Sequence, residues 1–88
     1  MSFNVITSDG LKETLKRLKR KDTVLFKQVQ KKINQVASFD ETTIQHFKNL
    51  KGNLSDYKRV HIGSFVLFFE ISGDIIIFDR LVHHDEAY

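Results

Sequence analysis

The sequence contains no cysteine and no proline, and only four of its 88 residues are glycine. Without cysteine there are no disulfides and no thiolate metal ligands, so packing alone must hold the core together. No apolar run approaches the ~20 residues of a membrane span, and the N-terminal MSFNVIT lacks the pattern of a signal peptide. No linker is marked by proline or low complexity. These absences predict a single cytoplasmic domain, residues 1–88, with no membrane partner.

Charge is distributed unevenly along the chain. Residues 1–60 carry 13 Lys and Arg against 6 Asp and Glu, whereas residues 61–88 carry 1 against 5, together with three of the four histidines. A basic surface attracts phosphate and speeds encounters with nucleic acid. A lysine-rich helix face can equally serve solubility, so charge alone leaves both interpretations open.

The N-terminal residues predict one strand followed by an amphipathic helix. FNVIT (3–7) alternates as a strand does. Ser8 or Asp9 can then provide the N-cap of a helix that begins near Gly10. The residues of its apolar stripe recur at helical spacing: Leu11, Leu15 and Leu18.

A second helix follows a turn near Lys21, with Asp22 or Thr23 as its cap. Its buried stripe is predicted to contain Phe26, Val29, Ile33 and Val36, with Val24, Leu25 and Ala37 beside them. Because the connection is so short, the two helices should form an antiparallel hairpin. Residues 40–50 suggest a further helical turn, with three apolar side chains pointing inward: Ile44, Phe47 and Leu50.

From residue 56 onward the periodicity is that of strands. Strands are predicted at 56–62, 65–72 and 75–82, separated by the turn pairs Gly63-Ser64 and Gly73-Asp74. The aromatic side chains of these strands are expected in the core rather than on a base-stacking surface: Phe65, Phe68, Phe69 and Phe78. The predicted fold is α+β in two layers, with an N-terminal strand, a helical hairpin and a three-stranded antiparallel meander.

Polar side chains on the first of these strands form a candidate site. Tyr57, Arg59 and His61 are spaced by two and so project from one face, whereas Lys58 points the other way. Arginine next to histidine places a permanent phosphate-binding cation beside a group that titrates near neutral pH. Arg59 and His61 can also be ordinary surface residues, so the strand alone does not decide between these interpretations.

The last strand can bring further residues to the same end of the sheet, namely Arg80, His83 and His84. The geometry after residue 82 determines which histidine points inward. The terminal residues can instead form a disordered tail, and Arg80 can simply pair with Asp79 or Glu70.

Imidazoles, a guanidinium and a phenol suit cleavage of RNA by its own 2′-hydroxyl. That reaction needs a base for the hydroxyl proton, a cation for the phosphorane and an acid for the departing 5′ oxygen. No metal or other cofactor is expected, because H-x-H and H-E-x-x-H spacings are absent from the sequence.

The segment from Leu50 to Tyr88 resembles the RelE/ParE toxin superfamily. The family pattern reads L-K-G, then an extended Y-R-x-R-V-G-x-Y-R strand and hairpin, then a hydrophobic strand ending in H-R-x-x-x-Y. The corresponding segments here are Leu50-Lys51-Gly52, YKRVHIGSF (57–65) and IIIFDRLVHHDEAY (75–88). The N-terminal strand and basic helical hairpin resemble the family in pattern.

This resemblance implies a small microbial-ribonuclease-like fold and, in the RelE branch, a ribosome-dependent endoribonuclease of a type II toxin–antitoxin pair. Toxins of that branch cut mRNA in the ribosomal A site and are neutralised by a co-expressed antitoxin. The implied partners are therefore a cognate antitoxin, mRNA on the ribosome and, only through the antitoxin, operator DNA.

The resemblance also assigns site residues. Arg59 stands at a phosphate-facing position and His61 at the next basic position, while His83 matches the terminal histidine, His84 its arginine and Tyr88 its tyrosine. The candidate catalytic residues are thus His61, His83, His84 and Tyr88, and which histidine is base or acid stays open. The side chains expected to bind the substrate phosphate are Arg59, Arg80, Lys58 and Lys51.

The chain departs from the family pattern at several positions. Val66 and His84 stand where arginine is expected, and the acids Asp85 and Glu86 stand where basic residues are common. A second function is therefore considered. The ParE branch resembles inhibitors that bind DNA gyrase without catalytic histidines, and a degenerate member would only bind its antitoxin.

Overall fold

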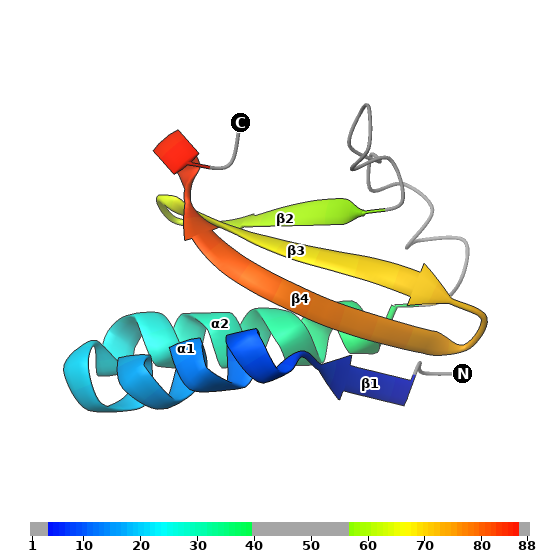
Figure 1. Cartoon of the computed structure of the whole chain (residues 1–88), viewed down its shortest axis with the longest axis horizontal. Coiled ribbons are helices and arrows are strands. Elements are labelled where there is room, and N and C mark those ends of the chain that lie inside the picture. The colour runs from blue at the N-terminus through cyan, green and yellow to red at the C-terminus, as the bar shows by residue number, and fades with distance from the viewer. Residues whose placement is uncertain (1–3, 40–56, 87–88) are drawn as a thin grey trace.

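The elements of the computed structural model, which describes residues 4–39 and 57–86, follow the predicted order (Figure 1). In chain order they are β1 (Asn4–Thr7), α1 (Asp9–Lys21), α2 (Thr23–Ala37), β2 (Lys58–Ile62), β3 (Phe65–Ser72), β4 (Ile75–His83) and the 3-10 helix η2 (His84–Glu86). The predicted helical turn at 40–50 lies outside the described residues. Both helices lie on one side of the sheet (Figure 1), which confirms the two-layer α+β prediction.

The four strands form one mixed sheet in the order β1-β4-β3-β2. β1 is parallel to β4, and the other neighbouring strands are antiparallel. The two predicted hairpin turns are present: Gly63 and Gly73 have φ of 58° and 61°, while the residues that follow them have negative φ. A positive φ at only the first turn position is the backbone of a type II′ hairpin, which glycine adopts without steric cost.

A single residue joins the two helices. The backbone N–H of Asp22 donates to the Leu18 carbonyl at 2.8 Å, which ends α1. Its carboxylate Oδ1 accepts the Leu25 N–H at 3.1 Å and so begins α2. Neither helix in the described part of the chain has the length and hydrophobicity needed to cross a lipid bilayer.

The main core lies between the helices and the sheet. Its buried helix residues are Leu11, Leu25, Val29, Ile33 and Val36, and its buried strand residues are Ile62, Leu67, Phe69, Ile76 and Phe78. The predicted stripe of α2 was wrong at its start, because Leu25 is buried where Phe26 was expected and Val24 is 69% exposed. Leu25 lies four residues before Val29 on the same helix face, whereas Phe26 is rotated about 100° from Leu25.

Of the four phenylalanines expected in the core, Phe69 and Phe78 belong to it and Phe65 packs against it. Phe68 is also buried, at 1% exposure, but it lies on the opposite face of the sheet.

Candidate active site

The polar residues gather on the face of the sheet that points away from α1 and α2, which we name the open face. On β2, Val60 and Ile62 pack toward the helices, so the alternating Arg59 and His61 point to the open face. Tyr57, just before β2, lines a hollow on this same side, as its spacing predicted. Lys58 pairs with Phe69 in the helix-facing register and is therefore not brought together with Arg59.

Two rows of side chains cross the open face from β2 to β4. In the first row, Arg59 lies opposite Phe68, which lies opposite Arg80. In the second row, His61 lies opposite Val66, which lies opposite Val82. Val66, at the position where the family pattern has arginine, is fully buried. The charged groups of the face therefore stand on either side of an apolar central strand.

A β-bulge at Asp79 places Arg80 on the open face. Phe68 pairs with Arg80 while Phe69 pairs with Phe78, so Asp79 has no partner residue on β3. In a regular strand Arg80 would share the helix-facing side with Phe78, and the extra residue returns it to the other face. No feature of IIIFDRLV signals this bulge, which depends on pairing rather than on local pattern.

Ser8, the N-cap of α1, holds the bulge in place. Its backbone N–H donates to the Phe78 carbonyl at 2.9 Å. Its Oγ–H donates to the carbonyl of Asp79, and the same Oγ accepts the Leu11 N–H at 3.1 Å. The start of the first helix is thereby connected to the strand that carries Arg80.

Of the two adjacent histidines, His84 is the one that meets His61. The His84 N–H donates to the Ser64 carbonyl at 2.8 Å, and this hydrogen bond holds the start of η2 beside the β2–β3 turn. The imidazole centroids of His61 and His84 are 5.8 Å apart, with an angle of 38° between the rings. These two imidazoles come from residues 23 positions apart in the sequence.

His83, which the resemblance matched to the family histidine, lies elsewhere. Its ring packs edge-on against Phe65 at 5.4 Å, on the helix-facing side. Its Nδ1 accepts the Asp85 backbone N–H at 3.3 Å, which requires an unprotonated Nδ1. The Asp85 Oδ2, 3.6 Å from the same nitrogen, becomes an ion partner only when the ring is protonated. The two histidines are thus separated where β4 ends at His83 and η2 begins at His84.

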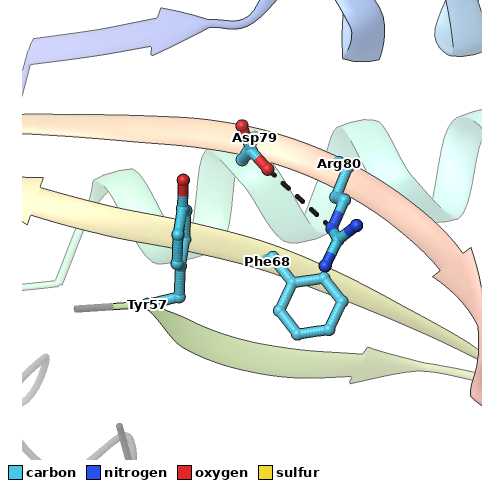
Figure 2. A pocket seen from close by; sticks show the side chains of 4 residues that line it. All are labelled: Tyr57, Phe68, Asp79 and Arg80. Atoms are coloured by element: carbon cyan, nitrogen blue, oxygen red, sulfur yellow. Dashed lines mark ion pairs between the residues drawn. The ribbon is translucent and has the colours of Figure 1, made fainter. Parts of the chain in front are cut away.

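Arg80 contacts both an aromatic ring and a carboxylate. Its guanidinium carbon lies 5.0 Å from the centroid of the Phe68 ring, and its Nε lies 3.9 Å from Oδ2 of Asp79. The pairing with Asp79 considered from the sequence is therefore present. With Tyr57 these residues line a hollow of about 240 Å³ on the open face (Figure 2).

Two predicted site residues, Lys51 and Tyr88, lie outside the described residues. Within residues 4–39 and 57–86, no group of three or more His, Asp or Glu side chains is arranged to hold a metal ion.

Comparison with known proteins agrees with the fold and with the resemblance seen in the sequence. Residues 5–88 match the model of the ParE toxin of the type II toxin–antitoxin system parDE. RelE4 of Methanocaldococcus jannaschii, which is named as a toxin, is 36% identical over 89 residues that cover 98% of this chain and 90% of RelE4.

Several solved structures share the fold. The YoeB dimer from Staphylococcus aureus superposes with a TM-score of 0.73 at 17% identity, covering 96% of this chain and 99% of that one. The toxin–antitoxin complex RelBE2 from Mycobacterium tuberculosis gives a TM-score of 0.68 at 15% identity, covering 94% and 99%. The family match spans nearly the whole sequence, and the chain therefore belongs to the ParE toxin family of type II toxin–antitoxin systems, within the RelE/ParE superfamily.

Proposed function

We propose that this toxin is a metal-independent endoribonuclease that cleaves mRNA on the ribosome. The observation that carries the proposal is the pair of imidazoles, His61 and His84, 5.8 Å apart on the open face. Attack of a 2′-hydroxyl on the adjacent phosphate needs one group to take a proton and another to return one to the 5′ oxygen. Two imidazoles on either side of one phosphodiester supply both groups without a protein nucleophile.

The charge that develops on the phosphorane is stabilised by the neighbouring guanidinium groups. Arg59 lies two residues before His61 on the same face, and Arg80 lies in the same row as Arg59 across Phe68. The resemblance adds Lys51 to the residues that bind the phosphate and Tyr88 to the catalytic residues. The ribosome orients the RNA, which is how a small open surface gains the positioning that catalysis needs.

An antitoxin is the proposed partner of this chain in the cytoplasm. The chain belongs to a family of toxins from toxin–antitoxin systems, and RelBE2, which shares the fold, is a toxin–antitoxin complex. Operator DNA is contacted only through that antitoxin. On this proposal, binding of the antitoxin keeps the toxin inactive until the antitoxin is lost.

Binding to DNA gyrase is the second candidate function. The observation that favours it is the matched family model, which is that of ParE. The exposed acids of η2, Asp85 and Glu86, also place negative charge beside His84, where RNA would approach.

The test is expression without antitoxin, followed by primer extension on cellular mRNA. We expect His61→Ala and His84→Ala each to lower cleavage by about 10²–10⁴-fold, the usual contribution of an acid or base. His83→Ala is the matched control and should keep most of the activity, because its ring packs on Phe65. Undiminished cleavage by both His61→Ala and His84→Ala would reject this site. A DNA-damage response without new mRNA ends would identify gyrase as the target.

A further inference from the structure

Ser8 is hydrogen-bonded both to β4 and to its own helix. Toward β4, its backbone N–H donates to the Phe78 carbonyl at 2.9 Å and its Oγ–H donates to the Asp79 carbonyl. Toward α1, its Oγ accepts the Leu11 N–H at 3.1 Å and its carbonyl accepts the Lys12 N–H at 2.9 Å. One residue therefore caps a helix and attaches that helix to a strand 71 positions away in the sequence.

This attachment lies at the point where the side chains of β4 change face. Phe78 before it and Leu81 after it both pack toward the helices, which the extra residue Asp79 makes possible. In a regular antiparallel ladder, Asp79 would stand opposite Phe68 and Arg80 would share the helix-facing side with Phe78. The bulge thus determines whether a cation or an anion stands opposite Phe68 on the open face.

The side-chain contacts of Arg80 on the open face are weak. Its guanidinium carbon lies 5.0 Å from the centroid of the Phe68 ring, and a cation–π contact at an exposed site contributes little. Its 3.9 Å ion pair with Asp79 joins side chains that are 52% and 36% exposed, so solvent screens it. The position of the guanidinium therefore depends mainly on the backbone of the bulge.

We propose that Ser8 is a positioning residue for Arg80, and this inference rests on the proposed ribonuclease function, in which Arg80 binds the substrate phosphate. Ser8 acts through the Asp79 carbonyl, which its hydroxyl holds in place. Without the hydroxyl the bulge loosens, and the guanidinium spends less time beside Phe68, where it can meet a phosphate. The start of α1, in the helical layer, thereby contributes to RNA binding on the other face of the sheet.

The first test measures binding of the purified full chain to a 2′-O-methyl RNA oligonucleotide at low ionic strength. Arg80→Gln should lower affinity about tenfold, as the loss of a charged hydrogen-bond donor does. It should also reduce the slope of log affinity against log salt by about 0.7, the share of one phosphate contact on a single strand. Ser8→Ala should lower affinity about threefold, because a neutral hydrogen bond contributes less than a charged one. In the Arg80→Gln background, Ser8→Ala should have no further effect.

Two variants separate positioning from helix capping. Asp22→Ala removes the corresponding cap of α2, the bond from the Leu25 N–H, and no contact with the bulge. It also removes a negative charge, so it should not lower RNA affinity. Ser8→Thr keeps a hydroxyl and should restore the affinity that Ser8→Ala loses. NMR gives a second readout, because the Phe68 ring shifts the Arg80 Nε–H resonance and only Ser8→Ala should move it toward the value of a free arginine.

The outcomes distinguish the positioning role from the proposed function. If Ser8→Ala binds RNA normally while Arg80→Gln binds it weakly, or if the Ser8→Ala effect persists in the Arg80→Gln background, the positioning role is overturned and the ribonuclease function stands. If Arg80→Gln also binds normally, the positioning role and the phosphate contact of Arg80 are both overturned. If the expected binding differences appear but primer extension finds no new mRNA ends, the positioning role stands and the ribonuclease function fails.

Discussion

Both faces of the β2-β3-β4 meander bury phenylalanine side chains, but the groups that contact these side chains differ between the two faces. On the helix-facing side, the rings of Phe69 and Phe78 lie 5.6 Å apart and are fully buried among apolar side chains. On the open face, Phe68 is 1% exposed, yet its neighbours are the Arg80 guanidinium and a hollow lined by polar groups. Burial of Phe69 and Phe78 on the helix-facing side stabilises the fold. Buried Phe68 on the open face also supports the charged guanidinium of Arg80.

The largest expected effect is on the free energy of unfolding, and it should differ between phenylalanines on the two faces. Phe78→Ala should lower the free energy of unfolding by about 3–5 kcal/mol, because it leaves a cavity in a closed core. Phe68→Ala should lower it less, because the hollow beside it can admit water to polar partners. Urea denaturation of the two variants measures both free energies. Equal losses of stability would mean that the open face is a second core.

A smaller effect tests whether Ser8 links the start of α1 to the bulge at Asp79. Ser8→Ala removes the N-cap of α1 and the bond to the Asp79 carbonyl, and should cost about 1–2 kcal/mol in unfolding free energy. Asp22→Ala is the matched control, since it removes the corresponding cap of α2 and no contact with the bulge.

Only Ser8→Ala should also shift the Asp79 and Arg80 amide resonances, because Ser8 bonds to the Asp79 carbonyl, and Ser8→Thr should restore them. Identical changes in the two alanine variants would show that Ser8 acts merely as a cap.

The sequence was sufficient for those features that depend on neighbouring residues. The alternation in YKRVHI correctly placed Tyr57, Arg59 and His61 on one face, and the Gly63 and Gly73 turns were correctly located. Asp22 was recognised as one of two possible caps because its side chain acts within its own turn. These are local effects, and local patterns encode them.

Features that depend on pairing between distant segments could not be predicted from the sequence. The bulge at Asp79 exists only relative to β3, and its attachment to Ser8 spans 71 residues. The sequence named both His83 and His84 as candidates. The hydrogen bond from the His84 N–H to the Ser64 carbonyl accompanies the placement of His84 beside His61, and local alternation does not reveal that contact. The site is therefore less predictable than the fold, because its residues meet through pairings between distant segments.

The smallest expected effect concerns the acid at the edge of the open face. Glu86 is exposed in η2, two residues after His84, and its charge opposes an approaching RNA backbone. Glu86→Gln should raise affinity for a 2′-O-methyl oligonucleotide, which cannot undergo 2′-hydroxyl attack, by roughly two- to threefold at low ionic strength. Salt should remove the difference, because exposed charges are screened. Glu13→Gln, on the helical layer, should leave affinity unchanged; if it raises affinity as much, the RNA senses only net charge and the open face has no special role in binding.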